Sequence, residues 1–250
     1  MLISHPPFII HHHKTLGSTN DLLKEMTDAP EFTCIVADEQ TAGRGRYART
    51  WHSTSGDGLY LSVLLCPQPN SPEISLLSLM AGISVAEILI ARGVKDVDIK
   101  WPNDVLVNER KICGILVEGA SSGSIVNRII VGIGVNLNHQ SFPVELSDNA
   151  TSLLLETEAS VVVAEFRDEL LDRIAYWYEK WNYKETELIL HRWQELSSYA
   201  VGKQITVTFD ENQIEGETAG LTETGALKLR TDNGELRTII AGEVKRVRNK

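Results

Sequence analysis

The chain has 250 residues, of which 42% are hydrophobic and 23% are charged, a composition typical of a soluble globular protein large enough to bury a core. Its formal net charge of -10 argues against nucleic acids and anionic membranes as partners. No segment approaches about 18 consecutive apolar residues, and the amino terminus lacks the basic start and long apolar stretch of a signal peptide, so we expect a cytoplasmic protein.

The first part of the chain predicts strands and one long helix. Residues 32–40, FTCIVADEQ, and 58–66, GLYLSVLLC, are apolar runs typical of buried strands, and a glycine-rich loop joins them. Apolar residues then recur at helical spacing from 72 to 93, with Ser71 as the expected N-cap and Gly93 as the expected stop. The three cysteines lie singly in such apolar runs, which indicates buried free thiols.

Hairpins and further helices follow before the pattern changes. Residues 97–119 and 127–138 are strand runs broken by turn residues, so successive hairpins predict a mixed or antiparallel sheet. Residues 160–181 and 185–196 have the apolar spacing of helices that cover a sheet face. After Ser197, short alternating strands separated by turns predict a small β-barrel-like domain. The predicted fold class is therefore α+β.

The segment EQTAGRGRYARTW, residues 39–51, places Arg44, Arg46 and Arg49 on the glycine-rich loop. Glycine lets the backbone approach an anion closely, and guanidinium groups form bidentate hydrogen bonds with phosphate, so the loop predicts a phosphate site. A solvated loop whose arginines balance nearby carboxylates is the alternative. The pattern GxGxxA at 43–48 is not a dinucleotide motif, because the residues after it cannot start a helix, and no Walker-type loop is present.

Two lysines bracket the hairpin that follows the long helix. Lys100 comes before the KWPND turn, and Lys111 comes after the next turn. A lysine can neutralise a carboxylate or a phosphate while charge moves between them, and Asn103 or Asp104 could ligate Mg²⁺ beside a nucleotide. Taken singly, each lysine is equally consistent with an ordinary solvated surface position.

Near the amino terminus, GSTNDLLKEM offers Ser18, Thr19 and Asn20 as helix-capping residues or as polar groups for a ligand. The histidines at 11–13 are adjacent on a predicted strand, where side chains alternate between faces and cannot converge on one metal ion. We therefore interpret them as surface residues.

Together GSTN, QTAGRGRYARTW and KWPNDVLVNERKICGILVEG, followed by VGIGVNLN and ATSL, resemble the biotin protein ligases. The resemblance covers the chain from about Ser18 to its carboxyl terminus, and the glycine-arginine loop followed by KWPND is highly specific. It implies a catalytic domain over residues 1–196, with the mixed or antiparallel sheet of the class II aminoacyl-tRNA synthetase-like fold. It also implies a small SH3-like β-barrel domain over residues 197–250.

The resemblance implies a two-step reaction with biotin and MgATP as substrates. The biotin carboxylate attacks the α-phosphate and releases pyrophosphate, and an acceptor lysine then attacks biotinyl-5′-AMP and releases AMP. The implied acceptor is the biotin carboxyl carrier domain of a carboxylase. The arginine loop would close over the adenylate and shield it from water, as active-site lids do.

The resemblance also implies roles for individual residues. The expected biotin-binding residues are Ser18, Thr19, Asn20, Gln40, Gly43, Arg44, Lys111 and Gly114. The expected nucleotide-binding residues are Arg46, Arg49, Trp51, Asn103, Asn136, Thr151 and Ser152. The expected catalytic residues are Arg44, Arg46, Lys111 and Asp104, and Asp104 is also the candidate Mg²⁺ ligand and a candidate proton acceptor in the transfer step.

Several alternatives and partners stay open at this point. A lipoate ligase or octanoyltransferase shares the catalytic fold class, and a non-catalytic biotin or nucleotide sensor would share the binding site. Only 17 residues precede Ser18, too few for the winged helix-turn-helix domain of some family members, so we expect no operator DNA binding. Exposed edge strands of such a sheet could pair across a two-fold axis and give a homodimer.

Overall fold

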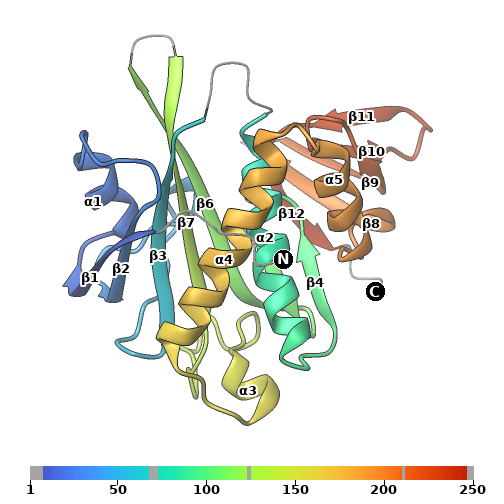
Figure 1. Cartoon of the computed structure of the whole chain (residues 1–250). Helices are drawn as coiled ribbons and strands as arrows, with labels where there is room; N and C mark the ends of the chain where they lie inside the picture. Colours follow the sequence, from blue (N-terminus) through green and yellow to red (C-terminus); the bar gives the residue numbers. More distant parts are fainter. Residues whose placement is uncertain (1–7, 68–72, 123–124, 210–211, 247–250) are drawn as a thin grey trace.

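A seven-stranded mixed sheet is the centre of the larger part of the protein (Figure 1). The structure is a computed structural model that describes residues 8–67, 73–122, 125–209 and 212–246. The strand order is β1-β2-β3-β7-β6-β5-β4. The strands are β1 (Ile9–Leu16), β2 (Thr33–Gln40), β3 (Gly58–Leu65), β4 (Val97–Lys100), β5 (Asp104–Val107), β6 (Arg110–Ser122) and β7 (Ile125–Asn136). Only β1 and β2 pair in parallel among these, so the predicted mixed sheet is confirmed.

The predicted hairpins account for the order of the last four strands. β4, β5, β6 and β7 follow one another both in the chain and in the sheet. Asn108 and Glu109, which join β5 to β6, have φ angles of 50° and 63°. Two consecutive left-handed residues match the right-handed twist of a two-residue hairpin, and asparagine tolerates that conformation well. This turn sets the register that brings Lys111 back beside the preceding strand.

The helices cover the two faces of the sheet unequally. α2 (Ser75–Ala91), α4 (Val163–Asn182) and α5 (Thr186–Glu195) pack together over one face, and α1 (Thr19–Glu25) contacts β2, β3 and β7. Side chains alternate between faces along a strand, so Leu64 joins Leu23 of α1 in a small cluster of its own, separate from the main core. The face that carries α1 is called the α1 face below.

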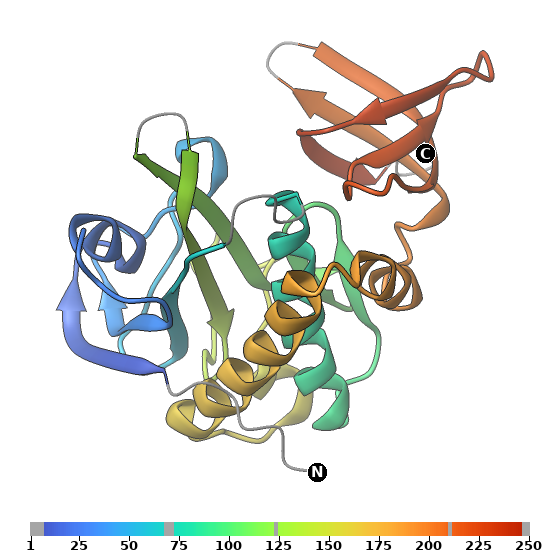
Figure 2. The ribbon, with the colours of Figure 1, turned by 45° about the horizontal axis from the view of Figure 1, so that its top comes forward.

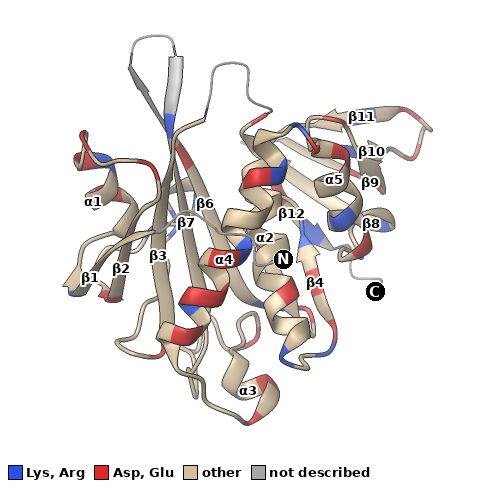
Figure 3. Ribbon diagram, viewed as in Figure 1, with Lys and Arg blue, Asp and Glu red and all other residues tan. Residues whose placement is uncertain are grey.

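The long helices form for the reasons that their sequences predict, with one difference at a terminus. α4 buries apolar side chains along one stripe, and its acidic residues lie on the outer surface (Figure 3). α2 is buried on nearly all sides and begins later than predicted, with Ile74 at the N-cap position and no side-chain cap. Ser71 lies outside the described residues, whereas Gly93 follows the helix with a φ of 81°, as the stop signal predicts.

The carboxyl-terminal strands form a second, antiparallel sheet with the order β11-β10-β9-β8-β12. These strands are β8 (Val201–Phe209), β9 (Asn212–Leu221), β10 (Leu227–Arg230), β11 (Leu236–Ile239) and β12 (Glu243–Arg246). The sheet lies beyond α5, to one side of the larger sheet (Figure 2). In the described part of the chain β11 and β12 are its two edges, and this small antiparallel sheet is consistent with the SH3-like domain that the resemblance implies.

The cysteines provide a simple test of the packing. Cys34 and Cys113 are fully buried, and burial raises the pKa of both thiols, that of Cys34 to about 12. Cys66 is only partly buried. Because the thiolate is the nucleophile, iodoacetamide should modify Cys66 well before the other two in the native protein. Mass spectrometry over time checks this order against a denatured sample, and modification of Cys113 as fast as Cys66 would contradict the packing.

None of the described helices is long and apolar enough to cross a membrane.

Candidate active site

A cavity of about 950 Å³ opens over the α1 face of the sheet. Its walls come from segments far apart in the sequence: the start of α1, the glycine-arginine loop, the turns around β5, the segment after β7 and the start of β12. The volume is typical of a site for a small molecule or cofactor. The cavity is therefore the candidate active site.

Glycines form the floor of this cavity. Gly114 of β6 pairs with Gly134 of β7, and Gly132 pairs with Leu116 one step further along the same face. A Cβ atom at Gly134 would lie 2.5 Å from the Trp51 ring, and one at Gly114 would lie 2.6 Å from it. Only glycine therefore lets the indole of Trp51 lie against the sheet. The two β7 glycines belong to VGIGVNLN. Glycines at alternate positions of a strand leave one of its faces without side chains.

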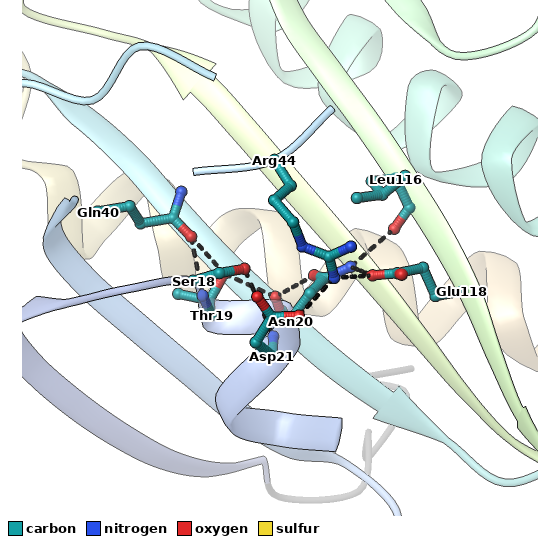
Figure 4. Close-up of polar contacts among 9 residues, drawn as sticks. Ser18, Thr19, Asn20, Asp21, Gln40, Arg44, Leu116 and Glu118 are labelled. Carbon is teal, nitrogen blue, oxygen red and sulfur yellow. Dashed lines mark hydrogen bonds and ion pairs between the residues drawn. The ribbon is translucent and has the colours of Figure 1, made fainter. Parts of the chain in front are cut away.

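A hydrogen-bond network closes the α1 end of the cavity (Figure 4). Gln40 Oε1 accepts from the Thr19 backbone N–H at 2.8 Å and from the Thr19 hydroxyl at 3.0 Å. Ser62 Oγ lies 2.7 Å from Thr19 Oγ1 and 2.5 Å from Asn20 Oδ1. Ser18 caps α1, as its sequence predicts, and accepts from the Asp21 N–H. These hydrogen bonds fix the orientation of the polar groups, which suits recognition of a polar head group.

The arginine loop folds back on itself over the cavity. The Gly45 N–H donates to the Arg49 carbonyl at 2.7 Å, and the Trp51 N–H donates to the Gly43 carbonyl at 2.9 Å. Between them a single 3₁₀ turn, η1 (Arg46–Ala48), contains two residues with positive φ. The loop is thus a compact flap held by its own backbone, and the three arginines project from it in different directions.

The side chains of the three arginines reach different parts of the protein. Arg44 Nη2 donates to Asp21 at 2.6 Å and to Glu118 at 2.7 Å, across the α1 end of the cavity. Arg46 Nη1 donates to Asn103 Oδ1 and to the Gly242 carbonyl, each at 3.3 Å. Arg49 pairs with Glu243 at the start of β12. Two of the three therefore contact residues at the start of β12 or immediately before it.

The two predicted lysines converge on one carboxylate. Lys111 Nζ lies 2.6 Å from Asp104 Oδ1, and Lys100 Nζ lies 4.0 Å from Asp104 Oδ2. Lys111 also lies 5.3 Å from the centroid of the Trp51 ring. Burial lowers the pKa of Lys100, and the charge of Lys111 adds to this effect, whereas Asp104 opposes it. A concentration of positive charge in a partly dry cavity is suited to stabilising charge on a phosphate.

Two family models match the chain. The Biotin/lipoate A/B protein ligase family matches residues 13–136, and the Biotin protein ligase C terminal domain matches residues 200–246. The bifunctional ligase/repressor BirA of Bacillus subtilis is 35% identical over 234 residues, which are 89% of this chain and 70% of that protein. The biotin--[acetyl-CoA-carboxylase] ligase of Paracoccus denitrificans is 34% identical over 215 residues, which are 84% of this chain and 88% of that protein.

The fold is also similar to that of a solved structure. The biotin protein ligase from Aquifex aeolicus in complex with biotin and ATP matches with a TM-score of 0.84 and 33% sequence identity, over 95% of this chain and 98% of that chain. The chain belongs to the biotin protein ligase family. The resemblance and the fold class inferred from the sequence are thereby confirmed.

Most of the residues predicted from the sequence line the cavity of this biotin protein ligase. They are Ser18, Thr19, Asn20, Gln40, Arg44, Arg46, Arg49, Trp51, Asn103, Asp104, Lys111, Gly114 and Asn136. The sequence interpretation did not single out Ser62, Glu118, Gly132, Gly134 or Glu243. Alternation along β6 and β7 offered a signal for the two glycines and for Glu118, which lies four residues after Gly114 on the same face.

Three predicted residues lie behind the lining of the cavity. Gly43 packs against the Trp51 backbone, where a Cβ atom would come within 2.7 Å of the carbonyl oxygen. Thr151 is fully buried, and its carbonyl accepts from Asn136 Nδ2 at 3.0 Å. Ser152 is also fully buried and caps α3 (Leu153–Thr157). Thr151 therefore supports Asn136 directly, whereas Gly43 supports the arginine loop and Ser152 the start of α3.

The surroundings of Asp104 bear on its predicted role as a Mg²⁺ ligand. Among the described residues no group of three or more histidine, cysteine, aspartate or glutamate side chains is placed to hold a metal ion. Asp104 instead faces Lys111 and Lys100. Mg²⁺ needs few protein ligands when nucleotide phosphates and water supply the rest. The donor set therefore fits a Mg²⁺ ion that enters with ATP, with Asp104 as a single carboxylate ligand at most.

The contact between Arg49 and Glu243 predicts a role for the carboxyl-terminal sheet. Both side chains are partly exposed, so Glu243→Gln should raise the KM for ATP by no more than about fivefold while the KM for biotin stays unchanged. The effect should shrink at high salt because exposed ion pairs are screened. Steady-state kinetics at two salt concentrations measure this, with Glu235→Gln, an exposed pair with Arg237 in the same sheet, as the control. An equal rise in both KM values would count against the assignment.

Proposed function

We propose that this protein attaches biotin to a lysine of a biotin carboxyl carrier domain in two steps that share the cavity described above. In the first step a biotin carboxylate oxygen bonds to the α-phosphorus of MgATP, the bond to the β-phosphate breaks, and pyrophosphate leaves. In the second step an acceptor lysine amine bonds to the biotinyl carbonyl carbon, loses a proton, and displaces AMP.

One observation carries the proposal. Lys111, the arginine loop and the Thr19–Gln40 network line the same cavity, so a head-group site and a phosphate site lie in series along one surface. The biotin head group fits the hydroxyl and amide end, since its ureido ring offers both donors and acceptors. The carboxylate would then point toward Lys111, whose side chain lies over the Gly114 end of the glycine floor.

The residues of this chain contribute charge, orientation and exclusion of water. Lys111 stabilises the negative charge that develops as the carboxylate and the α-phosphate meet. Arg46 and Arg49 hold the phosphates and retain their charge at any working pH. The arginine loop covers the mixed anhydride, which water would otherwise hydrolyse. Asp104 orients Lys111 through the 2.6 Å contact, and its further role as proton acceptor in the transfer step is part of the proposal.

The proposed acceptor is supported by a relative of this protein, whereas the biotin and phosphate sites are supported by the cavity itself. The relative from Paracoccus denitrificans is named as a ligase for acetyl-CoA-carboxylase, which supports a carboxylase carrier domain as the acceptor here. We further propose that the protein acts in the cytoplasm without binding nucleic acid, given its net charge of -10, and that a sheet edge forms a homodimer.

The test uses the whole purified chain with biotin, MgATP and a carrier domain from an acetyl-CoA carboxylase. Biotin-dependent ATP–pyrophosphate exchange and biotinylation of the carrier lysine are expected, with a Lys→Arg carrier as the control. Exchange that responds to lipoate or octanoate instead of biotin would favour the lipoate branch of the family model. Biotin binding without exchange would favour a sensor and refute the proposed function.

A further inference from the structure

Glu118 stands where three parts of the biotin end of the cavity meet (Figure 4). Its Oε2 atom accepts from Asn20 Nδ2 at 2.7 Å and from Arg44 Nη2 at 2.7 Å. Asn20 belongs to α1, Arg44 belongs to the arginine loop, and Glu118 itself lies on β6, the floor strand. One carboxylate oxygen therefore ties both walls of the pocket to its floor.

We infer that Glu118, assisted by Asp21, is a positioning residue that anchors the arginine loop through Arg44 and keeps the biotin pocket closed. Neither carboxylate lines the cavity, whereas Asn20 and Arg44 do. Glu118 thus acts through its two partners and does not touch the ligand. The anchoring of the loop does not depend on the proposed function. Only the identity of the retained ligand, biotinyl-AMP, rests on it.

The contacts of Arg44 indicate why it serves as an anchor. Its Nη2 atom donates to both Asp21 and Glu118, so the guanidinium is already committed to two carboxylates. The Arg44 side chain is 38% exposed, Asp21 is 48% exposed and Glu118 is 23% exposed. A single exposed ion pair contributes little, but a network with a shared and partly buried carboxylate contributes more. Arg46, by contrast, donates to neutral oxygens of Asn103, Gly242 and Tyr47.

The position of Glu118 makes it the firmest part of this anchor. It lies in the middle of β6 and pairs in register with Ile130 of β7, within the antiparallel core of the sheet. Asp21 lies in the first turn of a seven-residue helix and is more exposed. The loop should therefore depend more on Glu118 than on Asp21, because a group on a rigid strand holds its partner more precisely.

The test compares Glu118→Gln with Glu169→Gln. Glu169 lies on α4, away from the cavity, and this matched control breaks its 2.7 Å pair with Arg92 at the end of α2. Two rates are measured on the full chain. One is tryptic cleavage after Arg46 and Arg49 in the ligand-free protein, followed by mass spectrometry. The other is release of biotinyl-AMP formed on the enzyme, followed by chromatography. Glu118→Gln should raise both by about fivefold to tenfold at an unchanged unfolding midpoint.

Further variants separate anchoring from simple destabilisation. Glu118→Ala should also raise the KM for biotin, because Asn20 then loses its acceptor. In an Arg44→Lys background Glu118→Gln should add little, since the lysine lacks the guanidinium that the carboxylate holds. Wild-type release and cleavage rates in Glu118→Gln, or full additivity with Arg44→Lys, would overturn the inference. Absence of biotinyl-AMP in the wild type would refute the proposed function alone, because the ligand-free cleavage rates still test the anchor.

Discussion

Replacing Lys111 by methionine should lower biotin-dependent ATP–pyrophosphate exchange by about two to three orders of magnitude. The ammonium group lines the cavity beside Asp104, and it is placed to meet the negative charge that forms as biotin and the α-phosphate react. Methionine keeps most of the volume but offers no donor or charge. It also leaves Asp104 without its 2.6 Å partner, so the rate of adenylation should fall more than the affinity for biotin.

Isotope exchange and calorimetric titration with biotin measure these two effects separately. Lys14→Met is the control, because Lys14 is exposed on β1 outside the cavity. The variant should retain its fold, because the Lys111 side chain is 34% exposed. Exchange in Lys111→Met within about threefold of the wild type would remove this lysine from the chemical step.

Adding one methyl group to the floor of the cavity should weaken biotin binding by about ten to a hundredfold in Gly134→Ala. The new Cβ atom would lie 2.5 Å from the Trp51 ring, closer than any stable carbon contact. An indole packed against a strand cannot yield as a flexible side chain would, so the ring moves into the space needed by the ligand. The flap that carries Trp51 should shift with it.

Calorimetry of biotin binding checks this expectation, and Gly17→Ala serves as the control. A Cβ atom at Gly17 meets nothing within 4 Å, so the same methyl group enters open space. Gly114→Ala should behave like Gly134→Ala, because its Cβ atom would meet the same ring at 2.6 Å. Unchanged affinity in both floor variants would show that Trp51 leaves the glycine floor without cost when biotin binds.

The fold could be predicted from local patterns to a large extent. Apolar runs gave β2 and β3, turn residues gave the hairpins after α2, and apolar spacing gave α4 and α5. The start of α2 differed because Ile74 offers no capping side chain, so the sequence carries no marker for the true first turn. The parallel pairing of β1 with β2 depends on a distant partner strand, which a local pattern does not specify.

The site was harder to predict because its contacts cross the sheet and the two domains. Motifs found the loop, the lysines and the polar start of α1, but not the partners of the arginines. Glu243 lies in a short strand with no motif, and only the folded chain brings it to Arg49. Thr151 and Ser152 lie in a motif, but both side chains are fully buried, and Ser152 caps α3. Sequence position alone does not tell a lining residue from a bracing one.

The pairing of Arg49 with Glu243 joins residues 194 positions apart in the chain. Contacts with such long separation lose the most chain entropy and are expected to form late when a chain refolds. Trp181 and Trp193 are fully buried in the core formed by neighbouring helices and should reach their final environment earlier. After dilution from denaturant, fluorescence should therefore recover before the capacity to retain biotinyl-AMP, and the interval between them would measure the docking of the last wall of the cavity.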